Sequence, residues 1–147
     1  MALKLSTGLR NKMLDTGALR PTMSLGFIKI YAGTVQATAD AALDGTNVLL
    51  CTVSNASTAT GITLDPAANG SIPKAAAETW SGVNAATGTA TFYRHIAPAD
   101  DGTLSTTQAR IQGAIATSGA ELNLTSTTLT SGATQTVDFY SIALPTL

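Results

Sequence analysis

ARIQGAI, residues 109–115, is the stretch that decides the fold class. Small or apolar residues at 109, 111, 113 and 115 alternate with Arg110 and Gln112. A period of two residues places successive side chains on opposite faces of a β-strand. The pattern therefore predicts a half-buried strand, with an apolar face and a polar face that carries Arg110 and Gln112.

The same period recurs between turn signals along the rest of the chain. Residues 27–31 alternate before Gly33, and residues 48–54 form an apolar run between Asp44-Gly45 and Asn55. Such runs bounded by Gly, Pro, Asn and Asp are typical of short strands. Further strands are expected at residues 62–64, 71–72, 78–81, 89–97, 121–124 and 134–144.

Roughly seven to nine short strands at this spacing favour an all-β fold, an antiparallel β-sandwich or jelly roll. A parallel α/β fold is disfavoured because no second amphipathic helix follows the N-terminal segment. We interpret residues 34–46 as a long loop.

A short helix is expected near the N-terminus. Ser6 or Thr7 can cap its start, Gly17 can end it, and Pro21 is expected to prevent the helix from resuming. A helix this short is marginal in isolation, so it should form by docking its apolar face. We therefore divide the chain into a basic N-terminal arm (residues 1–22) and a β-sandwich body (residues 23–147). The apolar face of the helix comprises Leu5, Leu9 and Met13.

The N-terminal part of the chain, residues 1–29, differs in charge from the rest. The first 29 residues have a balance of +4, and the remainder has eight acids against three basic residues, a balance of −5. Only 12% of all residues are charged, and a weakly charged surface favours association. We therefore expect a homo-oligomer, a dimer or trimer, or a surface covered by a partner. The basic residues of the N-terminal part are Lys4, Arg10, Lys12, Arg20 and Lys29.

Few residues carry recognisable catalytic chemistry. His95 is the single histidine and no Gly-x-Ser-x-Gly motif accompanies it, so a partly buried or interface histidine is expected. Cys51 lies in an apolar strand, where a buried thiol is expected rather than a nucleophile. One histidine and one cysteine cannot build a structural zinc site within one chain. We expect no enzymatic activity, no metal site and no cofactor.

Two acidic turns are weaker metal candidates. Asp100-Asp101-Gly102, and Asp40 with Asp44-Gly45, could offer oxygen ligands to calcium. Neither has the spacing of an EF-hand loop, and Asp-Gly is primarily a turn signal. We therefore interpret both as turns.

Membrane and nucleic-acid partners are not favoured. The longest strongly apolar run, residues 48–51, is too short to span a bilayer. The basic arm lacks interleaved aromatic residues, so its charges are a weak signal for nucleic acid. Docking of the arm on an acidic protein surface is the interpretation that we favour.

Several stretches resemble small structural proteins of tailed-bacteriophage virions. They are residues 1–14 (MALKLSTGLRNKML), 26–33 (GFIKIYAG), 78–82 (ETWSG) and 135–140 (QTVDFY). Among such proteins, the chain is most similar to jelly-roll cement, or decoration, proteins. The resemblance implies a virion protein made in the bacterial host cytoplasm. It would bind the outer capsid surface and bridge neighbouring subunits of the major capsid protein, which stabilises the head.

The arm supplies the residues that we expect to contact the capsid. Its apolar residues would anchor it and its basic residues would complement an acidic surface, and multivalent binding would strengthen the attachment. Two alternatives remain: a neck, tail or baseplate protein, and a glycan-binding module on the virion surface with Tyr31, Trp80 and Tyr93 as stacking groups. The predicted capsid-interface residues are Lys4, Leu5, Leu9, Arg10, Lys12, Met13 and Arg20.

Overall fold

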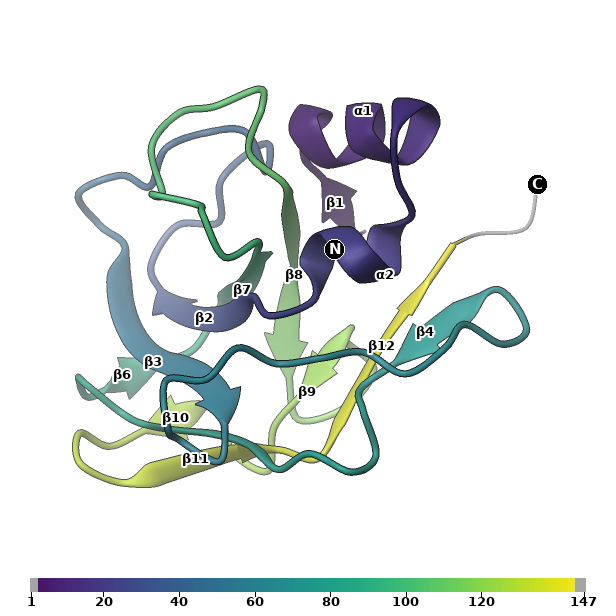
Figure 1. The fold of residues 1–147 in the computed structure, drawn as a ribbon. Coiled ribbons are helices and arrows are strands. Elements are labelled where there is room, and N and C mark those ends of the chain that lie inside the picture. Colours follow the sequence, from purple (N-terminus) through teal and green to yellow (C-terminus); the bar gives the residue numbers. More distant parts are fainter. Residues whose placement is uncertain (1–2, 145–147) are drawn as a thin grey trace.

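The computed structural model describes residues 3–144, a strongly curled β-sheet with two short helices packed beside it (Figure 1). Positions 1–2 of the predicted arm and 145–147 of the predicted body lie outside the described residues. In chain order, the elements are β1 (Lys4–Leu5), α1 (Thr7–Asp15), α2 (Leu19–Met23), β2 (Phe27–Ala32), β3 (Val48–Asn55), β4 (Ser71–Pro73), β5 (Trp80–Val83), β6 (Gly88–Thr89), β7 (Phe92–Ile96), β8 (Arg110–Ala116), β9 (Leu122–Asn123), β10 (Thr128–Leu129), β11 (Thr134–Val137) and β12 (Phe139–Ala143).

The centre of the sheet consists of β3, β2, β7 and β8, all paired antiparallel. Lys29 on β2 lies opposite Arg94 on β7, which in turn lies opposite Gln112 on β8. Directly opposed residues share one face of a sheet, so these polar side chains form a row. The apolar residues that alternate with them face the other side, as the period of two predicts.

The sheet curls until its two ends face each other. Its order is β11-β5-β3-β2-β7-β8-β9-β12-β4, in which β8 and β9 are parallel. Tyr140 on β12 reaches the opposite wall, where its ring centroid is 5.6 Å from those of both Trp80 and Tyr93. The described residues therefore form the predicted all-β sandwich with a short N-terminal helix.

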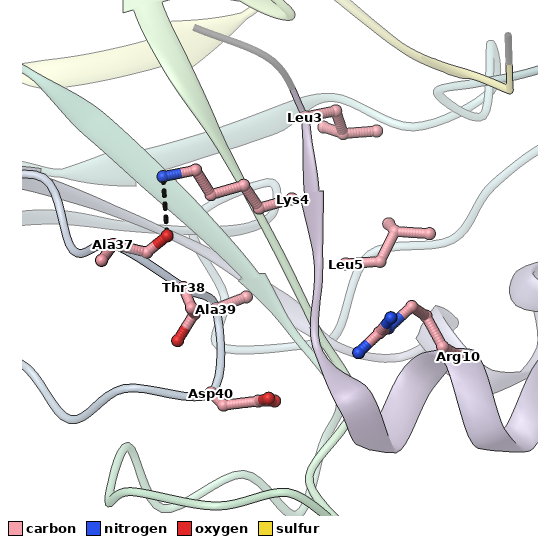
Figure 2. A pocket seen from close by; sticks show the side chains of 8 residues that line it. All are labelled: Leu3, Lys4, Leu5, Arg10, Ala37, Thr38, Ala39 and Asp40. Atoms are coloured by element: carbon pink, nitrogen blue, oxygen red, sulfur yellow. Dashed lines mark hydrogen bonds between the residues drawn. The ribbon is translucent and has the colours of Figure 1, made fainter.

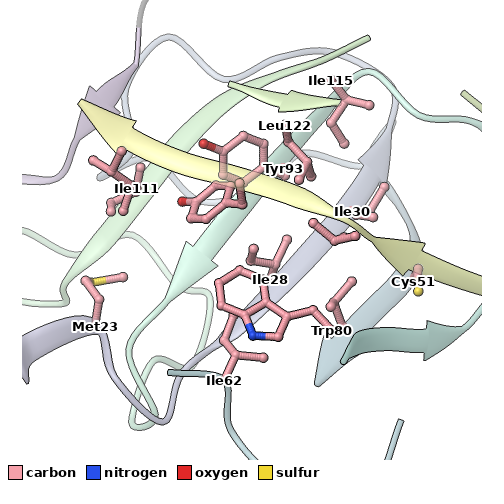
Figure 3. Close-up of a cluster of buried hydrophobic side chains, with 14 of the residues drawn as sticks. Met23, Ile28, Ile30, Cys51, Ile62, Trp80, Tyr93, Ile111, Ile115 and Leu122 are labelled. Atoms are coloured by element: carbon pink, nitrogen blue, oxygen red, sulfur yellow. The ribbon is translucent and has the colours of Figure 1, made fainter. Parts of the chain in front are cut away.

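The core lies inside this curl (Figure 3). Ile28 and Ile30 of β2 are fully buried against it. A bulge in β3 shifts the register between Ile30 and Tyr31, and both Leu50 and Cys51 are buried there. The bulge thereby adds a second apolar side chain to the interior at one level of the sheet.

Gly113 is the residue that leaves room for the Tyr93 ring. A Cβ atom at position 113 would lie 2.7 Å from both Cε1 and Oη of Tyr93. Tyr93 is fully buried and packs edge-on to Tyr140, so its ring has little room to move. The glycine inside the strand pattern is therefore explained by a close side-chain approach.

We predict that Gly113→Ala lowers the free energy of unfolding by about 1–3 kcal/mol, because the added methyl group overpacks the Tyr93 site. Gly45→Ala is the matched control, since a Cβ atom there meets nothing within 4 Å. Urea denaturation of both variants measures the difference. Equal stability of the two variants would contradict this account of Gly113.

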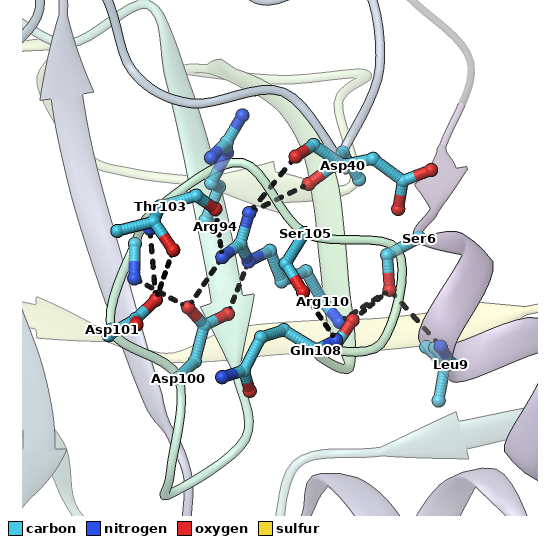
Figure 4. A network of polar contacts seen from close by, with 12 residues as sticks. Ser6, Leu9, Asp40, Arg94, Asp100, Asp101, Thr103, Ser105, Gln108 and Arg110 are labelled. Carbon is cyan, nitrogen blue, oxygen red and sulfur yellow. Dashed lines mark hydrogen bonds and ion pairs between the residues drawn. The ribbon is translucent and has the colours of Figure 1, made fainter.

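The outer face of the sheet buries polar side chains beneath two loops (Figure 4). The Arg110 guanidinium pairs with Asp100 and donates to the Thr103 carbonyl at 2.6 Å. Gln112 Nε2 donates to the Gln36 carbonyl at 2.8 Å. The predicted loop at residues 34–46 is confirmed, and these bonds attach part of it to the sheet.

Arg94 lies on the same face with a different environment. Its Nε donates to Gln112 Oε1 at 3.0 Å, while neither Nη atom has a hydrogen-bond partner within residues 3–144. Burial, followed by the nearby charge of Arg110, lowers the pKa of Arg94. The body is acidic in total, yet its outer face holds a buried positive charge without an ion-pair partner among the described residues.

The two acidic turns have structural roles. The Asp100 carboxylate binds Arg110 and the Gly102 amide, and Asp101 accepts from Thr103. Both carboxylate oxygens of Asp40 bind Thr7, at 2.7 Å to its N–H and 2.6 Å to its hydroxyl. The contacts of Asp100 with Gly102 and of Asp101 with Thr103 are local turn contacts, whereas the contact of Asp40 with Thr7 joins the loop to the start of α1.

The N-terminal segment is part of the sandwich and not an extended arm. Ser6 caps α1, with its Oγ accepting from the Leu9 amide at 3.2 Å, and Leu9 is 0% exposed. β1 pairs with β8, and a Cβ atom on Gly8 would lie 2.3 Å from the Thr107 carbonyl oxygen. α1 therefore contributes a core residue and contacts the body closely.

Pro21 does not prevent a second helix, contrary to the prediction. Pro21 lies in the first turn of the five-residue helix α2. Backbone N–H groups in the first turn have no intrahelical partner, so the N–H that proline lacks costs the helix no hydrogen bond. Leu19 and Met23 of α2 are buried. The helix thus adds two apolar side chains beneath the inner face of the sheet.

His95 is a buried core residue on β7. Its Nε2 is 3.2 Å from the Met23 carbonyl and its Nδ1 is 3.2 Å from Tyr140 Oη. A carbonyl only accepts, so Nε2–H donates to Met23 and Nδ1 accepts from Tyr140. Burial lowers the pKa of His95 to about 4, although the bond to Met23 opposes the shift.

We predict that His95 makes the protein less stable as the pH falls from about 6.5 to about 4. The unfolded chain takes up the proton first, because its histidine keeps the ordinary pKa. At 1.36 kcal/mol per pKa unit, the loss is about 3 kcal/mol. Urea unfolding across this pH range should show a shallower decline for His95→Gln than for the wild type. An identical decline in both proteins would contradict the assignment.

Candidate functional site

β1 and α1 form two adjoining hollows on the surface of the protein. The larger, of about 490 Å³, lies between β1 and residues 37–40. The smaller, of about 260 Å³, lies against α1, and the two share Leu5 and Arg10. We call the two hollows together the N-terminal groove; its lining residues are Leu3, Lys4, Leu5, Arg10, Met13, Leu14 and residues 37–40.

The strand alternation of β1 gives the groove two different sides. Figure 2 shows the Lys4 side chain pointing toward residues 37–40, while Leu3 and Leu5 point the other way. Lys4 lies opposite Gln112 and Leu5 opposite Ile111, which fixes these directions. Lys4 Nζ donates to the carbonyls of Gln36 at 3.2 Å and Ala37 at 3.0 Å. An ammonium group has three N–H donors, so one remains for a partner.

The helical side of the groove combines apolar and basic side chains. Leu14 is 84% exposed, and Met13 is half-buried beside it. Arg10 is exposed one helical turn before Leu14, and its guanidinium donates to the Thr7 hydroxyl at 3.0 Å. The result is an exposed leucine flanked by a guanidinium, a combination that suits an apolar and acidic partner.

The structure brings four of the seven predicted interface residues into the groove: Lys4, Leu5, Arg10 and Met13. Lys12 is exposed on α1 outside the lining. Arg20 is exposed on α2 with its Nε donating to the Leu64 carbonyl at 2.8 Å. Leu9 is a correction: it is fully buried in the core, so it anchors α1 to the body and is not available to a partner.

Leu3, Leu14 and the wall at residues 37–40 were missed by the interface prediction. Leu14 follows Arg10 by four residues, so helical periodicity places it on the same face. The signal that could have identified Leu14 is an apolar residue on the solvent side of a short helix. The wall of the groove at residues 37–40 comes from a loop distant in sequence, which Asp40 fixes by binding Thr7 at the start of α1. No local sequence pattern predicts that contact.

The aromatic residues proposed as a glycan platform are core residues. Trp80 is 1% exposed and Tyr93 is 0% exposed, while Tyr31 stacks on Phe92 with ring centroids 5.3 Å apart. Their rings are covered by neighbouring side chains. The prediction that these three side chains stack on a sugar is therefore wrong for this fold.

Cys51 is buried, as its apolar strand predicted. Desolvation raises the pKa of its thiol to about 11. The thiolate is the nucleophilic form, so Cys51 is almost entirely in the unreactive thiol form at neutral pH.

Within residues 3–144, no cluster of three or more His, Cys, Asp or Glu side chains is arranged to hold a metal ion. Neither helix in this part of the chain has the length and apolar character needed to cross a membrane.

Comparison of the chain with protein-family models, curated proteins and solved structures finds no match. We therefore infer function from the sequence and from the geometry of the N-terminal groove.

Leu9 and Leu14 of α1 should differ sharply in their effect on stability. We predict that Leu9→Ala lowers the free energy of unfolding by about 2–5 kcal/mol, because it leaves a cavity in the core. Leu14→Ala should change it by less than about 0.5 kcal/mol, because the side chain is exposed. Urea denaturation tests both variants. A large loss of stability in Leu14→Ala would contradict the assignment of that residue to a free surface.

Proposed function

We propose that this chain is a capsid cement protein of a tailed bacteriophage. In this role it is a non-enzymatic structural protein that binds the outer capsid surface and bridges neighbouring capsid subunits. The resemblance of residues 1–14, 26–33, 78–82 and 135–140 to small virion proteins supports the proposal. The sandwich fold and the N-terminal groove are compatible with it.

The observation that carries the proposal is the exposure of Leu14 beside Met13 and Leu5, with Lys4 and Arg10 at the margins. Full burial of a leucine side chain is worth about 1.5–3 kcal/mol. A partner that covers Leu14 gains part of this free energy, and carboxylates on that partner would meet the basic margin. Both features favour attachment to a protein surface.

Bridging requires more than one attachment for each assembly. We propose that copies of the chain associate, so that each N-terminal groove contacts a different capsid subunit. Closed symmetric oligomers present identical surfaces around an axis, which suits a local symmetry axis of a capsid. Linked weak contacts raise the effective concentration of each further contact and so give a strong attachment.

The proposal is tested by co-sedimentation of the purified chain with expanded capsids of the phage that encodes it. We predict that Leu14→Ser weakens binding by about tenfold, because it removes an apolar anchor worth more than 1 kcal/mol. Arg10→Gln should also weaken binding, and more so at low ionic strength, because exposed charges are screened by salt.

Two control variants separate the groove from general surface effects. Val83→Ser removes an aliphatic side chain that is 55% exposed on β5, far from β1 in the sheet order. Thr136→Glu lowers the net charge by the same amount as Arg10→Gln, at an exposed position of β11. Both should bind as the wild type does. Failure of the wild-type chain to sediment with capsids would overturn the proposal.

A further inference from the structure

The N-terminal groove contains an open edge of the sheet. β1 pairs with β8 alone, and no strand among residues 3–144 pairs with its other edge. Figure 2 shows β1 with residues 37–40 on the side of the Lys4 side chain and Arg10 of α1 on the side of the Leu5 side chain. An open strand edge is a template for a further strand.

The hydrogen-bond alternation shows which backbone groups face this edge. Ser6 N–H donates to the Arg110 carbonyl at 3.0 Å, which makes Ser6 and Arg110 a hydrogen-bonded pair. In an antiparallel ladder such pairs alternate with pairs that point their N–H and C=O groups outward. Leu5, opposite Ile111, is therefore in an outward-pointing position.

The hydrogen bonds along the other edge of β8 lead to the same assignment of which residues bond to which neighbouring strand. Ala97 N–H donates to the Ala109 carbonyl at 3.1 Å, so odd-numbered residues of this stretch bond toward β7. Ile111 is one of these residues, so its backbone groups bond to β7. Leu5, which lies opposite Ile111 on β1, therefore has no backbone partner on β8. By this register the Leu5 N–H and C=O point away from β8, and Leu5 lines the groove together with Lys4 and Arg10.

We propose that an extended acidic segment of a partner protein adds to β1 as a further strand, with its backbone bonded to Leu5. This rests on the proposed attachment function and specifies its binding mode. Side chains of an added strand alternate, so one set would face Lys4 and the other would face Leu3, Leu5 and Leu14. An acidic residue in the first set would accept the remaining Lys4 donor, and apolar residues in the second would cover the leucines.

Charge argues against a second copy as the occupant of this edge. Antiparallel pairing of two β1 strands through Leu5 would place the Lys4 side chains of the two copies at diagonal positions on one face of the sheet. Diagonal neighbours are within reach of long side chains, so these like charges would repel each other. A carboxylate-bearing strand has the complementary sign.

The test uses the full chain and the peptide acetyl-Val-Asp-Val-Asp-Val-amide. We predict that this peptide slows hydrogen exchange of the Leu5 amide, followed by NMR, and that the lysine analogue acetyl-Val-Lys-Val-Lys-Val-amide binds more weakly. No change in Leu5 exchange with the acidic peptide would overturn the inference. Protection of Leu5 on concentrating the chain alone would also overturn it, since a second copy would then occupy the edge.

A pair of variants separates the backbone contact from the side-chain contact. Leu5→Pro removes the outward N–H, which an edge strand tolerates, and Leu5→Ala keeps that N–H while also shortening the side chain. We predict that the proline variant binds the acidic peptide about fivefold more weakly than the alanine variant, the worth of one net hydrogen bond. Equal binding by the two would contradict strand addition.

The fold of each variant is checked by circular dichroism before binding is compared. Wild-type protein supplies the independent exchange measurement if the proline variant fails to fold. If the chain binds capsids but the acidic peptide does not protect the Leu5 amide, the proposed attachment function holds and strand addition is overturned. If the acidic peptide protects the Leu5 amide but the chain does not bind capsids, strand addition holds and the proposed attachment function is overturned.

Discussion

Strand β8 is the element on which the rest of the structure depends. β7 pairs along one edge of it, while β1 and β9 share the other edge at different heights. Its inner face carries Ile111 and Ile115 into the core, and its outer face carries Arg110 and Gln112 toward the loops. A single alternating strand thereby joins the core, the covering loops and the N-terminal segment.

Hydrogen bonds hold the base of the groove together. Ser6 lies at the junction of β1, α1 and β8. Its N–H donates to the Arg110 carbonyl, and its Oγ accepts from the Arg110 N–H. The same Oγ accepts from the Leu9 N–H and so caps α1. Asp40 then holds the loop wall against Thr7. Leu5 and Leu14 are therefore presented from a packed scaffold, which limits the entropy lost when a partner binds.

Local patterns in the sequence predict the elements but not their contacts. The alternation in residues 109–115 and 27–31, and the cap at Ser6, follow from backbone geometry and are found in the structure. The prediction that residues 109–115 are half-buried is wrong, because loops cover Arg110 and Gln112 and bury the outer face of β8 as well. The charge pattern distinguishes a basic N-terminal segment, and the buried Leu9 shows that this segment still contributes to the core. The burial of Trp80, the Tyr93–Gly113 fit and the Asp40–Thr7 contact join residues distant in sequence, so only the folded chain reveals them. The sequence indicates the basic and apolar side chains of the proposed interface. The open strand edge at Leu5 depends on the register between β1 and β8, which the sequence does not predict.

The central claim is the proposed virion role, in which Leu9 holds α1 to the body and Leu14 and Arg10 contact the capsid. In the capsid setting, the most direct measurement is the copy number of this chain in purified phage particles, by quantitative mass spectrometry against the major capsid protein. A stoichiometry comparable to that of the capsid protein is the predicted result. A few copies per particle would place the chain in the neck, tail or baseplate, and its absence from particles would contradict the virion role.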